Sequence, residues 1–174
     1  MNTPNVIDFN KINKIKAEIK ARNSIIPKHL AYLRKKNDMS FNTLAQLTGL
    51  SIPYLCIIEK GKQIPSIEAL VKLHEIYDVS VDFLTGRSDV VRKYTHSQNK
   101  REHFADLRRS RGFKQVEIAN ILGYRSIAPV YRQEKNGISM KLDRLEILAD
   151  YFNVPLDYIL GLTDSSTIRD GVMK

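Results

Sequence analysis

Positively charged side chains are the groups in this 174-residue chain best suited to chemistry. Arg125, Arg132 and Lys135 stand close together in the second half, with Ser126 and Tyr131 among them. Guanidinium and ammonium groups bind phosphate oxygens, and arginine can also donate two hydrogen bonds to guanine. The whole chain agrees, since its net charge is +9 and its pI about 9.6. We expect an anionic partner, nucleic acid first, although a basic charge also fits a merely soluble protein.

Patterns for catalysis, metal binding and membrane insertion do not stand out. The sequence has no evident carboxylate pair, nucleophile–base set or glycine-rich phosphate loop, so we expect no enzyme and no cofactor. Cys56 and four scattered histidines do not make a zinc site, so no metal is expected. A single cysteine fits a reducing, cytoplasmic location. No apolar run approaches the ~20 residues that span a bilayer, and the N-terminus lacks a signal-peptide pattern.

Two segments of the chain end in nearly the same way: YDVSVDFLTGRSD at 77–89 and FNVPLDYILGLTD at 152–164. The correspondence extends backward through both copies. Matching residues are 75 positions apart from the pair Ser51 and Ser126 onward, and 74 positions apart before that pair. The second copy therefore carries one extra residue, near Arg125. Two copies of roughly 60 residues, each about the size of a small domain, cover most of the chain.

Each copy is predicted to be a string of short helices. No stretch shows sustained polar–apolar alternation, so no strand is expected. Ser40 and Ser51 are good helix N-caps, and Gly49 is a good C-terminal stop. The expected organisation is an N-terminal helix in 1–26, the first copy at 27–88, a linker at 89–99, the second copy at 100–164 and a frayed tail at 165–174.

The N-terminal segment is expected to form an amphipathic basic helix over about residues 6–22. Phe9, Ile12, Ile15 and Ile19 lie at helical spacing, and most lysines fall off that stripe. The apolar stripe would pack on the first copy or on a second subunit. Alternatively, the helix would lie along nucleic acid as an arm.

The first copy reads LRKKNDMSFNTLAQLTGLSIPYLCIIEKGKQIPSIEALVKL through its centre. This segment closely resembles the Cro and phage-repressor type of helix-turn-helix domain, and the second copy resembles it more loosely. The resemblance implies an all-α protein with two tandem five-helix lambda-repressor-like DNA-binding domains after the N-terminal amphipathic helix. It also implies an arginine–glutamate pair, a small alanine and a turn glycine in each copy: Arg34, Glu59, Ala45 and Gly49, then Arg108, Glu134, Ala119 and Gly123.

On the family pattern, helix 51–60 of the first copy would enter the major groove of DNA. The groove-facing set is unusually apolar, and Phe41 stands where the family often has glutamine. Methyl groups can contact the thymine methyl, which predicts a thymine-preferring reader; a surface that contacts protein is the alternative. Cys56 would be a thiol switch or a small filler. The implied DNA-binding residues are Ser40, Asn42, Ser51, Ile52, Pro53, Tyr54, Cys56, Ile57, Lys60 and Lys62.

The second copy has a charged face over its corresponding helix, 126–135. Its frame departs from the pattern, since Lys114 replaces the capping serine, Asn136 the glycine and Gln133 the apolar anchor. We expect this helix to be displaced or rotated, or the copy to dimerise instead of reading bases. The implied DNA-binding residues are Gln115, Arg125, Ser126, Tyr131, Arg132 and Lys135.

The expected function is a sequence-specific transcription regulator, a repressor by the family's common mode, with double-stranded DNA as partner. A homodimer on a palindromic site is one arrangement. In another arrangement, both domains of one chain would bind successive major grooves of one DNA site. The linker between them could span the required distance, since it reaches ~35 Å when extended. The rival hypothesis is an antitoxin-like or anti-repressor-binding module, in which one domain dimerises or binds protein.

Overall fold

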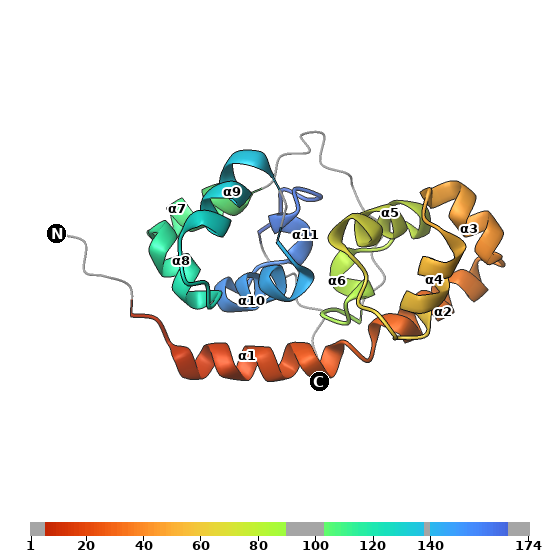
Figure 1. Ribbon diagram of the computed structural model, residues 1–174, viewed down its shortest axis with the longest axis horizontal. Helices are drawn as coiled ribbons and strands as arrows, with labels where there is room; N and C mark the ends of the chain where they lie inside the picture. Colours follow the sequence, from red (N-terminus) through yellow and green to blue (C-terminus); the bar gives the residue numbers. More distant parts are fainter. Residues whose placement is uncertain (1–5, 90–102, 138–139, 167–174) are drawn as a thin grey trace. The chain divides into compact units, whose positions relative to one another are not determined.

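The computed structural model describes residues 6–89, 103–137 and 140–166. These residues form eleven α-helices and no strand, which confirms the predicted all-α class (Figure 1). They divide into two compact units, one holding α2 to α6 and the other α7 to α11 together with most of α1. Apart from Asp89, Ser165 and Ser166, the predicted linker and tail lie outside the described residues.

Serine side chains set the starts of four helices in the first-copy unit. Ser40, Ser51, Ser66 and Ser80 each accept a hydrogen bond from the backbone N–H three residues ahead. Each bond satisfies an amide that has no partner within the helix. The helices are α2 (Ile26–Lys36), α3 (Phe41–Thr48), α4 (Ile52–Glu59), α5 (Ile67–Tyr77) and α6 (Val81–Leu84).

The helices of the second-copy unit follow the same order without such caps. Lys114 cannot accept a hydrogen bond through its side chain. Instead, its backbone N–H donates to the Glu117 carboxylate at 2.6 Å, which ties down the start of α8. The helices are α7 (Phe104–Ser110), α8 (Gln115–Ile121), α9 (Ala128–Asn136), α10 (Leu142–Phe152) and α11 (Leu156–Ile159). Helix α9 begins two residues later than the predicted 126.

The N-terminal helix α1 (Phe9–Arg22) forms as predicted, but its partner differs from the expected one. Its stripe of Ile12, Ile15 and Ile19 is buried, and this part of the chain clusters with the second-copy unit. The Lys11 ammonium donates to the backbone oxygen of Tyr151 in α10 at 2.8 Å and lies 4.8 Å from the centre of its ring. The expected packing on the first copy is therefore wrong over most of α1.

No single described helix is long and apolar enough to cross a membrane. Helices α3 and α4 meet those criteria only when taken as a pair, and they are bent by 112° to one another.

The packing of α1 predicts a specific loss of stability when its stripe is shortened. Ile15→Ala removes a side chain that is 5 % exposed, and we expect unfolding to become easier by about 3 kcal/mol. Lys14→Ala, on the exposed side of the same helix, is the control and should change stability by less than about 0.5 kcal/mol. Urea unfolding and amide exchange in α10 measure both. Equal effects of the two variants would contradict the packing.

Candidate nucleic-acid interface

A sharp turn sets the direction of α4. Helices α3 and α4 are bent by 112°, within the range of about 90–120° at which helix-turn-helix pairs cross. Gly49 ends α3 in the left-handed conformation with φ +68°, and its N–H donates to the Ala45 oxygen at 2.8 Å. Side chains resist this conformation, so glycine lets the chain turn at little cost. Gly123, at the matching place after α8, has φ +70°.

An ion pair joins the end of α4 to α2. Arg34 donates from Nε and Nη2 to the two carboxylate oxygens of Glu59, at 2.8 and 2.7 Å. Its third nitrogen donates to the Met39 oxygen at 3.0 Å, and the Phe41 ring centre lies 4.2 Å from the guanidinium carbon. The hydrogen bond to Glu59 raises the pKa of Arg34 although burial opposes it. The pair is 16 % and 12 % exposed, so α4 is anchored in a partly dry contact.

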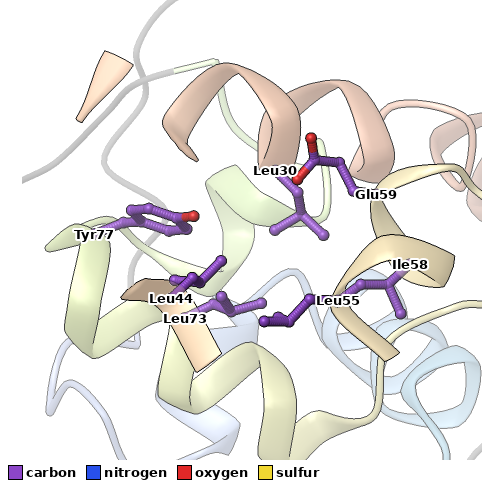
Figure 2. Close-up of a pocket in the computed structure, with 7 residues that line it drawn as sticks. All are labelled: Leu30, Leu44, Leu55, Ile58, Glu59, Leu73 and Tyr77. Carbon is purple, nitrogen blue, oxygen red and sulfur yellow. The ribbon is translucent and has the colours of Figure 1, made fainter. Parts of the chain in front are cut away.

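Glu59 also lines a small pocket whose other lining side chains are mainly aliphatic (Figure 2). Its volume of about 10 Å³ is too small for a ligand larger than water. Tyr77 lines it, and burial together with the Glu59 charge raises the pKa of this phenol to about 12. Besides Glu59 and Tyr77, the lining residues are Leu30, Leu44, Leu55, Ile58 and Leu73. The candidate binding surface is therefore the outer side of α4, which is exposed at Ile52 and Ile57.

The second-copy unit builds the same ion pair with a different third member. Arg108 donates to both oxygens of Glu134, at 2.5 and 3.1 Å, and to the Phe113 oxygen at 2.7 Å. Gln115 stands where Phe41 stands in the first copy, and its amide donates to Glu134 at 2.8 Å. Burial opposes ionisation, but the bonds from Arg108 and Gln115 lower the pKa of Glu134. Gln115 was expected to contact DNA. One hydrogen of its side-chain amide is instead bonded to Glu134, which helps to hold α9 in place.

The predicted contact residues of the first copy lie mostly on the solvent side of α4 and its flanks. Ile52 and Ile57 are 39 % and 37 % exposed. Tyr54 is half-buried, and its hydroxyl accepts the N–H of Ser66 at 2.9 Å, which ties it to the start of α5. Cys56 is half-buried. Exposed residues of the predicted set are Ser40, Asn42, Ser51, Pro53, Lys60 and Lys62.

The predicted contact residues of the second copy, apart from Gln115, are exposed on or just before α9. They are Arg125, Ser126, Tyr131, Arg132 and Lys135. Gln133, which replaces the apolar anchor, is 1 % exposed, and its side-chain oxygen accepts the N–H of Met140 at 3.1 Å. A satisfied amide therefore fills the position that Ile58 fills in the first copy.

Three contacts that help to hold the helices in place were not predicted from the sequence. His29 stacks on Phe83 with ring centres 4.4 Å apart, and His103 stacks on Tyr158 at 4.5 Å. The offset of 74 between the two histidines was the signal that could have found this repeated contact. Arg144 of α10 donates to the Leu122 oxygen at the end of α8, which holds the longer turn before α9. That partner is distant in sequence, so no local pattern indicated it.

Two further apolar side chains beside α4 were also missed. Leu47 of α3 and Ile64 after α4 are 53 % and 49 % exposed.

Among the described residues, no group of three or more His, Cys, Asp or Glu side chains could hold a metal ion.

Most of the excess positive charge lies outside the described parts of the two copies, 27–89 and 103–166. Residues 27–89 hold eight Lys and Arg against seven Asp and Glu, and residues 103–166 hold nine against eight. Most of the +9 excess is therefore carried by the first 26 residues and by residues 90–102. Within the units, only the placement of individual cations can distinguish one surface from another.

The sharply bent helix pair and its glycine turn are features of the helix-turn-helix class. Comparison with known families agrees: residues 30–84 match the family described as helix-turn-helix. This supports the resemblance to the Cro and phage-repressor type and indicates a DNA-binding regulator. Residues 93–174 match a different family, described as BetR domain, so a second domain of the same kind stays a prediction. No similar curated protein and no similar solved structure was found.

The ion pair predicts a large difference between two neighbouring arginines of α7. Arg108→Met leaves Glu134 partly buried without its main partner, and we expect a loss of about 3 kcal/mol in stability. Arg109→Met is the matched control: Arg109 forms an exposed pair with Asp106 at 3.5 Å, worth less than about 1 kcal/mol, and its charge has the smallest influence among those that lower the pKa of Glu134. Thermal or urea unfolding measures the difference. Similar losses for both would show that the pair does not anchor α9.

The lowered pKa of Glu134 predicts an acid-sensitive contribution to stability. A carboxylate with a lowered pKa in the folded state stabilises above its unfolded value, near 4.5, and loses that effect as pH falls through the folded value. The stability advantage of the natural protein over Glu134→Gln should therefore be constant near neutral pH and shrink below about pH 4.5. Urea midpoints measured for both proteins from pH 7 to pH 3 test this. A difference that stays constant over the whole range would refute it.

Proposed function

We propose that the protein is a sequence-specific DNA-binding transcription regulator that acts as a repressor in the cytoplasm. The observation that carries the proposal is the pose of α4: bent by 112° from α3, anchored by Arg34 and Glu59, and open on its outer side. A helix held in this way can enter a major groove of B-DNA, which is about 12 Å wide. The helix-turn-helix match over residues 30–84 supports the same conclusion.

The two sides of α4 would have different roles: one side packs on the core of the domain, and the other would contact DNA bases. Leu55 and Ile58, three residues apart, are 2 % and 1 % exposed and fix the helix to the core. Ile52 and Ile57 remain exposed for the groove. Lys60 and Lys62 are exposed just after the helix and would neutralise phosphates.

Helix α9 is proposed as a second reader with different chemistry. Arg125, Arg132 and Lys135 are exposed there, and guanidinium groups suit phosphates and the guanine edge. The Arg108–Glu134 pair would hold α9 as Arg34 and Glu59 hold α4. A homodimer would present two such surfaces to half-sites ~34 Å apart, and occupation of a promoter would repress it.

A selection from random duplexes followed by mobility-shift titration tests the proposal. We expect one enriched motif, with affinity that falls as salt rises because phosphate contacts release counterions. Arg132→Ala should weaken binding by ~1–3 kcal/mol if the side chain reads a base. Lys72→Ala is the control, since its ammonium pairs with Glu68 on α5 at 3.0 Å.

Two results would argue against this function in different ways. If no duplex is enriched at either of two salt concentrations, the regulator proposal fails. If a motif is enriched but Arg132→Ala binds it as well as the natural protein, α9 is not a reader.

An interaction module that binds protein is the second candidate, because Leu47, Ile52, Ile57 and Ile64 expose apolar carbon on and beside α4. A large exposed apolar patch on a protein is often a site of contact with another protein. Sedimentation of the natural protein and of Ile57→Asp separates the candidates: self-association abolished by this change, with no duplex enriched, would favour the module.

A further inference from the structure

Polar side chains of α4 and its cap are already bonded within the protein. The Ser51 hydroxyl accepts the N–H of Tyr54 at 3.3 Å, and the Tyr54 hydroxyl accepts the N–H of Ser66 at 2.9 Å. The Glu59 carboxylate is bound at both oxygens by Arg34. Between these residues, α4 carries only Ile52, Pro53, Leu55, Cys56, Ile57 and Ile58.

The groups that remain for the groove on α4 are mainly hydrocarbon. Ile52 and Ile57 are 39 % and 37 % exposed, Pro53 is exposed, and Cys56 is at most a weak donor. Apart from the hydrogen of the Ser51 hydroxyl at the cap, α4 therefore offers no strong hydrogen-bond donor to base edges. The one apolar group in the major groove is the C5-methyl of thymine.

We infer that α4 selects A·T base pairs through contact between the side chains of Ile52 and Ile57 and thymine methyl groups. The inference rests on the proposed function, because it requires α4 to lie in the groove. Methyl contact removes apolar surface from water on both partners, and cytosine offers only a polar amino group nearby. The methyl lies on one side of the groove, so T·A is distinguished from A·T at each contacted step.

Helix α9 of the same chain differs from α4 in the chemistry of its exposed side. Its outer side carries Arg132 and Lys135, and Arg125 precedes it, so it offers charged donors where α4 offers hydrocarbon. Ile127 occupies the position that matches Ile52, but it lies before the first residue of α9. The thymine selectivity is therefore assigned to the first-copy unit, and a site that engages both units would combine a thymine-rich part with a guanine-containing part.

Deoxyuridine tests this contact directly, because it lacks only the methyl group of thymine. The full chain is titrated against its selected duplex and against duplexes in which one thymine at a time is replaced by deoxyuridine. At each contacted thymine we expect binding to weaken by up to about fourfold, the value of one buried methyl group. In Ile52→Ala or Ile57→Ala, the natural duplex should bind more weakly and one deoxyuridine penalty should disappear.

The variants are chosen so that folding does not confuse the result. Both isoleucines are more than one-third exposed, so truncation to alanine should leave the fold intact, as circular dichroism and urea unfolding can verify. Ile127→Ala, 46 % exposed in the other unit, is the matched control and should keep every penalty that Ile52→Ala and Ile57→Ala remove.

The outcomes separate the inference from the function on which it rests. Absence of any preferred duplex overturns both. A preferred duplex that tolerates deoxyuridine at every thymine overturns the methyl contact and leaves the regulator proposal standing. Deoxyuridine tolerance together with loss of self-association in Ile57→Ala assigns this side of α4 to a protein partner and overturns the inference in favour of that contact.

Discussion

The arginine–glutamate pair is the contact on which each helix-turn-helix candidate depends. It joins the first helix of a unit to the end of the exposed helix, 25 residues later in the first copy and 26 in the second. Removing these side chains from water costs free energy, and two hydrogen bonds between each arginine and its glutamate offset that cost. Because the glutamate is the last residue of α4 and lies in the last turn of α9, the pair fixes the angle at which the opposite side of that helix is presented.

Around this shared anchor, the two copies use different neighbours to reach the same result. Phe41 covers the Arg34 guanidinium with an aromatic ring, whereas Gln115 gives Glu134 a further hydrogen bond. Ser40 caps one helix with its own oxygen, and Lys114 relies on Glu117. The frame thus tolerates exchange of polar and apolar partners as long as each buried polar group is satisfied. The outer sides of α4 and α9 carry no such constraint, and there the copies diverge.

Local features of the fold were predictable because the residues that make them are close in sequence. Ser40 and Ser51 cap helices through bonds that span three residues, and Gly49 ends α3 where the turn was expected. The stripe of isoleucines in α1 also appeared as a helical period. The net charge was less informative, since it indicated an anionic partner while most of the excess lies in residues 1–26 and 90–102 and not on the candidate reading helices. Composition adds up charges without placing them.

The sequence by itself determined the helices, their order, the repeat and the residue types offered on each helix. Only the tertiary structure decided which unit α1 covers and which polar groups remain available for a ligand. Lys11 bonds to a residue 140 positions away, Gln115 to one 19 away, and Tyr54 to one 12 away. Such bonds depend on how helices pack, and packing brings together residues that no local period or cap relates. The free surface of α4 is therefore known only after these partners are counted.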